Sequence, residues 1–136
     1  MSTPYDSTYR PPFPVLAVVL RSEDGTVGPL AALLDSGADA TVVPSHLLEE
    51  IAALEGEQAT LRSHFGDTRL VQTYLANIEV DGHVLPGVYV VGDDEGDEII
   101  LGRDILNKLP LFLDGSQQQT QILDEEMTNR LRSRRT

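Results

Sequence analysis

One short segment, residues 31–44 (AALLDSGADATVVP), carries residue types and spacing that suit catalysis. Asp35 directly follows two apolar residues expected to be buried, where an ionisable group is costly unless its charge is satisfied or used. Ser36 and Gly37 then form a tight turn, in which glycine allows close approach and the hydroxyl can fix the loop. Asp35 is therefore a candidate catalytic carboxylate, although the tripeptide alone also fits an ordinary surface turn.

The longer stretch, Leu-Leu-Asp-Ser-Gly-Ala-Asp-x-Thr-Val-Val, resembles the active-site loop of retropepsins, the single-lobed aspartic proteases. Residues 99–106 (IILGRDIL) resemble the second signature of that family, in which apolar residues precede Gly, Arg and an Asn or Asp that opens a helix. The Leu-Asp-Gly at residues 113–115 is similar to the bacterial branch. The resemblance covers residues 15–115. It implies a mainly β fold, a retropepsin-like closed β-barrel with one or two short helices, in the homodimeric acid-protease arrangement.

The activity that this resemblance implies is that of an aspartic endopeptidase acting on polypeptides. Each subunit of a homodimer would give one Asp35 to a site on the dimer axis, because one Asp-Ser-Gly loop cannot build a two-carboxylate site. Two close carboxylates titrate as a coupled pair that shares a proton. The ionised Asp35 would take a proton from the attacking water while the protonated one donates to the peptide carbonyl. No metal or cofactor is required.

The resemblance also implies roles for other residues. Ser36 would brace the two loops across the axis, and Arg103 would pair with Asp39 inside the subunit, which suits the bidentate fork of arginine. The alternative for Arg103 is a solvated position on a helix. The residues implied to bind substrate are Gly37, Ala38, Asp39, Phe65 and Ile100.

The flap over the site is expected at a hairpin of residues 61–70, whose tip (residues 63–67) holds one glycine instead of a glycine-rich run. Phe65 there either covers substrate as an apolar lid or packs in the core. His64 is interpreted as a solvated loop residue. Three scattered histidines do not make a metal site.

Turn signals and periodicity predict the elements that must position these residues. The Asp-Gly dipeptide at residues 81–82 favours a two-residue hairpin turn. The predicted strands cover residues 15–20, 27–34, 70–80, 83–91, 98–101 and 109–113, and the predicted helices cover residues 44–54, 103–109 and 124–132. Residues 1–14 are interpreted as a Pro-rich arm, 15–115 as the protease domain and 116–136 as a polar and basic tail.

Composition excludes several classes of function. The chain has 136 residues, no cysteine and a net charge of −12, with 10 basic against 22 acidic residues. Without the four arginines of the last seven residues the charge is 6 − 22 = −16, so phosphate backbones would be repelled and nucleic-acid binding is not expected. No segment is long and apolar enough to span a membrane. A cytoplasmic protein is expected.

Two charged segments leave alternatives open. The acidic residues 93–98 either favour basic side chains in substrate or are a solvated loop. The basic end is disordered, packs on the acidic body, or is a self-processing site.

Two other functions compete with the protease. One is a catalytically inactive dimerisation or interaction module that keeps this fold. The other is a monomeric regulatory β-barrel, for which the acidic body gives only weak support.

Overall fold

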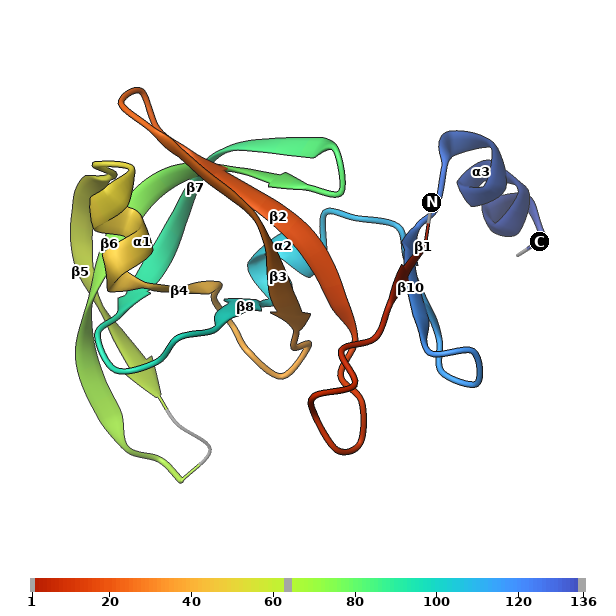
Figure 1. Cartoon of the computed structure of the whole chain (residues 1–136), viewed down its shortest axis with the longest axis horizontal. Helices are drawn as coiled ribbons and strands as arrows, with labels where there is room; N and C mark the ends of the chain where they lie inside the picture. Colours follow the sequence, from red (N-terminus) through yellow and green to blue (C-terminus); the bar gives the residue numbers. More distant parts are fainter. Residues whose placement is uncertain (1, 63–64, 135–136) are drawn as a thin grey trace.

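Six strands close into a barrel in the order β2-β3-β8-β4-β7-β6, and β6 pairs back onto β2 (Figure 1). The computed structural model describes residues 2–62 and 65–134. The predicted mainly β closed barrel is confirmed, with three short helices among the described residues. The strands are β1 (Ser2–Pro4), β2 (Val15–Arg21), β3 (Thr26–Leu34), β4 (Val42–Pro44), β5 (Leu54–Arg62), β6 (Thr68–Val80), β7 (His83–Asp93), β8 (Ile99–Leu101), β9 (Leu111–Asp114) and β10 (Gln119–Ile122). The helices are α1 (Ser45–Glu50), α2 (Arg103–Leu106) and α3 (Glu125–Ser133).

Local turn chemistry sets the two hairpins of the barrel. β2 pairs antiparallel with β3, and β6 with β7, as the sequence predicts. Asp81 and Gly82 both have positive φ, 46° and 84°, which is the geometry of the tight hairpin turn that Asp-Gly favours. β6 is long enough to pair with β5 through its first half and with β2 through its last four residues.

The core lies inside this barrel and under α1 and α2. Alternate residues of β2 point inward, and Leu16, Val18 and Leu20 are fully buried. Other fully buried apolar residues come from α1 and its end (Leu48, Ile51), β6 (Ile78, Val80), β7 (Val90), β8 (Leu101) and α2 (Ile105).

β8 lies between β3 and β4, although these two are close neighbours in sequence. It pairs parallel with β3, with Leu101 opposite Leu34, and antiparallel with β4, with Ile100 opposite Val42. The segment between Leu34 and Val42, which contains Asp35, therefore loops over the end of β8.

A second sheet joins the two ends of the described chain, beside the barrel (Figure 1). β10 pairs antiparallel with both β1 and β9. Neither β1 nor β10 is predicted from the sequence, because Ser-Thr-Pro and Gln-Thr-Gln-Ile lack a run of alternating apolar residues, and β1 pairs only with the distant β10 in the described part of the chain.

Two helices end earlier than the sequence predicts. α2, expected to reach residue 109, ends at Leu106. The helix expected over residues 44–54 ends at Glu50, and β5 already begins at Leu54, seven residues before the predicted return of strand. Leu54 has helical spacing but is 67% exposed, so the buried face of the helix ends at Ile51. α3 is found close to its prediction, with Asp124 accepting from the Met127 N–H and arginines in the last turn. None of the helices in residues 2–62 and 65–134 is long and apolar enough to cross a membrane.

Candidate active site

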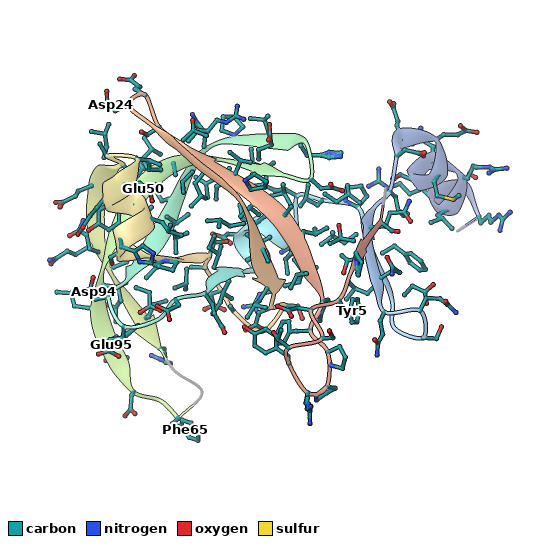
Figure 2. The ribbon with its side chains drawn as sticks, in the orientation of Figure 1. Tyr5, Asp24, Glu50, Phe65, Asp94 and Glu95 are labelled. Carbon is teal, nitrogen blue, oxygen red and sulfur yellow. The ribbon has the colours of Figure 1, made fainter. Side chains whose placement is uncertain are left out.

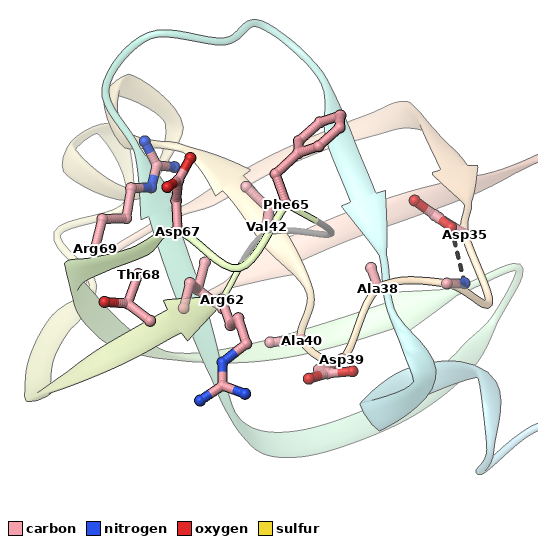
Figure 3. A pocket seen from close by; sticks show the side chains of 12 residues that line it. Asp35, Ala38, Asp39, Ala40, Val42, Arg62, Phe65, Asp67, Thr68 and Arg69 are labelled. Carbon is pink, nitrogen blue, oxygen red and sulfur yellow. Dashed lines mark hydrogen bonds between the residues drawn. The ribbon is translucent and has the colours of Figure 1, made fainter.

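Asp35 stands at the end of buried strand β3, in a loop that returns into β4. Its N–H donates to the carbonyl of Leu101 at 3.0 Å, which ties the loop to β8. The Gly37 N–H donates to Asp35 Oδ1 at 2.9 Å, the bond marked by the dashed line in Figure 3. Asp35 is partly exposed. The loop thus fixes the carboxylate while leaving it open to solvent and to substrate.

Gly37 leaves little room for a side chain beside this carboxylate. A Cβ at this position would lie 3.1 Å from Asp35 Oδ1, tighter than an ordinary van der Waals contact. The close backbone approach that the Asp-Ser-Gly turn suggests is therefore present in the structure.

Arg103, at the start of α2, binds the middle of the Asp35 loop at two places. Its Nη1 donates to the Ser36 carbonyl at 2.9 Å, and its Nη2 donates to the Asp39 carboxylate. The side chains of Arg103 and Asp39 are 47% and 80% exposed, so this ion pair positions the loop more than it stabilises the fold.

A buried hydrogen-bond network around Thr41 joins the end of the Asp35 loop to the start of α2. No role for its members was predicted from the sequence. Thr41 is fully buried, and its hydroxyl donates to Asp104 Oδ1 at 2.7 Å and accepts from the Gly102 N–H at 3.1 Å. The Thr41 N–H donates to Asp104 Oδ2 at 3.1 Å. Asp104, in the Gly-Arg-Asp signature, is the residue from which this network could have been predicted, because an acid near the start of a helix often accepts backbone N–H groups.

Gly102 brings the α2 segment against the backbone of the loop. A Cβ on Gly102 would lie 2.7 Å from the carbonyl carbon and oxygen of Ala40 and 2.9 Å from the Ala38 oxygen. The Arg103 N–H donates to that Ala38 carbonyl at 2.9 Å. All three residues of Gly102-Arg103-Asp104 therefore contact the loop that carries Asp35.

A cleft of about 730 Å³ separates this loop from the hairpin of β5 and β6 (Figure 3). The loop side supplies Asp35, Gly37, Ala38, Asp39, Ala40 and Val42, and the hairpin side supplies Leu61, Arg62, Phe65, Asp67, Thr68 and Arg69. The volume falls within the range of small-molecule and peptide pockets.

The cleft contains most of the residues expected to bind substrate. Gly37, Ala38, Asp39 and Phe65 line it, whereas Ile100 does not; Ile100 is half-buried in β8 between Leu33 and Val42. Phe65 lies at the end of the hairpin and is 93% exposed, which excludes core packing, and its role as a lid over substrate stays a prediction (Figure 2). Ser63 and His64, which the sequence places at the same tip, lie outside the described residues.

The acidic segment 93–98 contributes no residue to the described cleft lining. Several of its carboxylates accept hydrogen bonds from other groups of the same chain. Asp94 accepts from the Ser45 hydroxyl at 2.6 Å, Asp93 accepts from the Glu95 N–H at 3.0 Å, and Glu98 accepts from the Tyr9 hydroxyl. The segment is better described as a hydrogen-bonded loop than as a wall of this cleft.

The family of the chain follows from a comparison of its sequence with family models. The model described as gag-polyprotein putative aspartyl protease matches residues 24–108, which include the Asp35 loop and the Gly102-Arg103-Asp104 signature. The chain belongs to this aspartyl protease family. No curated protein matches the sequence at a significant level.

Solved structures of retroviral proteases share the fold of this gag-type aspartyl protease. The solution structure of simian foamy virus (mac) protease is 22% identical, with a TM-score of 0.50 over 68% of this chain and 91% of that one. The EIAV protease complexed with the inhibitor HBY-793 is 23% identical, with a TM-score of 0.53 over 71% of this chain and 86% of that one. At these identities the likeness concerns the fold.

Proposed function

We propose that the protein is an aspartic endopeptidase in which two copies of the chain each supply Asp35 to one site. The observation that carries this proposal is the Asp35 carboxylate, held by the Gly37 N–H at the wall of a cleft of about 730 Å³. Membership in an aspartyl protease family supports the class of reaction. The catalytic unit in this proposal is residues 15–115.

The reaction needs one acid and one base, and a pair of carboxylates sharing a proton supplies both. The ionised Asp35 would remove a proton from a water molecule whose oxygen bonds to the peptide carbonyl carbon. The protonated Asp35 of the second copy would donate its proton to the carbonyl oxygen. When the C–N bond then breaks, the amine takes a proton and leaves, and the acyl part ends as a carboxylic acid. No step requires a metal or cofactor.

The other loop residues position the substrate in this proposal. Gly37 would let the peptide backbone approach Asp35 closely, because it has no side chain. Asp39, on the cleft wall, would accept from a substrate N–H while Arg103 orients it. Phe65 would cover the bound peptide, and Ser36 would bond across the dimer axis.

The decisive experiment compares wild type with Asp35→Asn on a diverse mixture of unstructured peptides, read by mass spectrometry from acidic to neutral pH. We expect cuts that disappear in the variant, a rate per chain that rises with protein concentration, and a decline as pH rises and the pair loses its shared proton. Activity that kept rising through alkaline pH would contradict the dyad. If a dimeric wild type cuts nothing, the chain is an inactive interaction module with this fold.

A further inference from the structure

Positive charge is scarce in this protein, yet part of it lines the cleft. Outside the last seven residues the chain has six cationic side chains against 22 acids overall. Two of the six, Arg62 and Arg69, line the cleft on its hairpin side. The other four are Arg10, Arg21, Arg103 and Lys108.

Neither of the two cleft arginines, Arg62 and Arg69, forms an ion pair with an acid in the described part of the chain. Arg21 pairs with Glu79 at 3.6 Å, and Arg103 pairs with Asp39. Arg62 is exposed and lies at the end of β5, where the hairpin overhangs the Asp35 loop.

The strand register separates Arg62 from Arg69. Arg62 is opposite Thr68 across the hairpin, and Arg69 is opposite Leu61, so the two arginines belong to adjacent cross-strand pairs and project to different faces. In Figure 3 the Arg62 guanidinium extends to the side where Asp39 is drawn, whereas Arg69 extends to the other side with Asp67. Asp39 is already held by Arg103. Arg62 therefore presents a cation to the cleft without an acid of its own.

We propose that Arg62 selects peptides with an Asp or Glu side chain close to the scissile bond. This inference rests on the proposed function and names its substrate class. In a site shared by two copies, each copy would present its own Arg62, so acidic side chains are accepted on either side of the cut. The preference is opposite to the one that the acidic residues 93–98 suggest, and those residues do not line the cleft.

Physical chemistry sets the size of the effect. An exposed ion pair contributes only a small binding free energy in water, and this free energy changes a rate or an affinity by about two- to fivefold. The other charged groups of the lining, Asp35, Asp39, Asp67 and Arg69, are the same in wild type and in a variant of Arg62, so the difference between the two proteins reports on Arg62 alone. It weakens as salt rises, because screening acts on exposed charges.

The test uses matched peptides that differ only by Glu or Gln at positions flanking a cut found in the peptide mixture. We expect wild type to show a kcat/KM about two- to fivefold higher for the Glu peptide, Arg62→Gln to remove the difference, and Arg62→Glu to reverse it. Arg21→Gln is the matched control, because Arg21 lies on β2 outside the cleft lining, and it keeps the wild-type ratio.

A binding measurement separates this inference from the proposed function. Fluorescence anisotropy of the same labelled peptides on Asp35→Asn reports affinity without cleavage. Tighter binding of the Glu peptide that Arg62→Gln abolishes supports the role of Arg62, even if wild type cuts nothing and the proposed function fails. A Glu to Gln ratio that is the same in wild type and Arg62→Gln, in cleavage or in binding, overturns it.

Discussion

Thr41 joins the two signature segments through a single buried hydroxyl. That hydroxyl donates to Asp104 and accepts from the Gly102 N–H, so one oxygen connects the Asp35 loop with the start of α2. Buried polar groups of this kind stabilise a fold only while every partner is present, because an unpaired buried group loses its hydration without compensation.

Replacing this hydroxyl with a methyl group should therefore be costly. We expect Thr41→Val to lower the free energy of unfolding by about 1–3 kcal/mol, because it leaves the Gly102 N–H without its acceptor and Asp104 Oδ1 without a donor. Urea denaturation followed by circular dichroism measures the change.

Thr120→Val is the matched control for this substitution. Thr120 is equally buried, but its hydroxyl has no hydrogen-bond partner in the described part of the chain. The same change there should leave the free energy of unfolding unchanged or raise it. If both variants lost the same free energy of unfolding, the hydrogen bonds of the Thr41 hydroxyl would contribute nothing to stability.

At the residue scale, the family resemblance predicted the Arg103–Asp39 pairing, which the structure shows, and a catalytic role for Asp35, which stays a prediction. It did not identify Thr41, whose neutral hydroxyl bonds with Gly102 and Asp104, 61 and 63 residues away. Ile100, also expected at the substrate, pairs within the sheet with Leu33 and Val42 and is absent from the described cleft lining, and its role in binding stays a prediction.

At the scale of elements, the junction of β8 and α2 is the part that fixes the Asp35 loop. Gly102→Ala would push a Cβ to 2.7 Å from the Ala40 backbone, which cannot move without shifting the loop. We expect a loss of about 1–3 kcal/mol in the free energy of unfolding, together with reduced peptide cleavage. Thermal and urea unfolding measure the first effect, and the peptide assay measures the second.

Gly115→Ala provides the comparison for this prediction. A Cβ at Gly115, between β9 and β10, meets nothing within 4 Å. Its free energy of unfolding should stay within about 0.5 kcal/mol of wild type, with cleavage unchanged. If Gly102→Ala behaved in the same way, the close packing of α2 on the loop would not matter.

The N-terminal arm also has a defined contact with the rest of the chain. The Tyr9 hydroxyl donates to the Glu98 carboxylate, and this hydrogen bond, followed by burial and by the charges of Glu98 and Asp6, raises the pKa of Tyr9 to about 12. Because the folded state holds the phenol proton more tightly, the contact contributes stability below about pH 10 and loses it as pH rises to about 12.

Removing the Glu98 charge tests this contact. We expect Glu98→Gln to lower the pKa of Tyr9 towards its ordinary value, so that more tyrosine is ionised at a given pH between 10 and 12. Ultraviolet absorbance titration measures ionisation, and Tyr9→Phe assigns the signal. Glu95→Gln serves as the control in the same loop. If Tyr9 titrated alike in Glu98→Gln and Glu95→Gln, the Tyr9–Glu98 hydrogen bond would not be the cause of the raised pKa.

Elements were predicted best where their signals are local. The β6–β7 hairpin follows from Asp81-Gly82 and alternating apolar residues, and α3 follows from its acidic start and basic end. β5 is polar and pairs only with β6, so neither burial nor periodicity marks where it begins. β1 depends on a partner that lies more than a hundred residues away, β10.

At the scale of the whole molecule, charge opposes the dimer that the proposed site requires. Two copies of net charge −12 repel each other over about 30 Å at about 0.01 M salt and about 8 Å at about 0.15 M. We expect the dimer dissociation constant to fall several-fold between these salt concentrations, with cleavage per chain rising in parallel. Sedimentation equilibrium measures the first quantity. Association that is independent of salt would show that net charge does not govern it.

The position of β8 also sets an order of events during synthesis. β3 and β4 emerge from the ribosome early, but β8, which lies between them, begins only at residue 99. The two residues that hold the Asp35 loop by hydrogen bonds also come late: Leu101 is the last residue of β8, and Asp104 follows it. A nascent chain that stops before β8 exposes two unpaired strand edges, which are prone to pair with other chains. Such non-local pairing also folds slowly, on a scale of about milliseconds to seconds. The Asp35 loop is thus assembled only when nearly the whole barrel has been made.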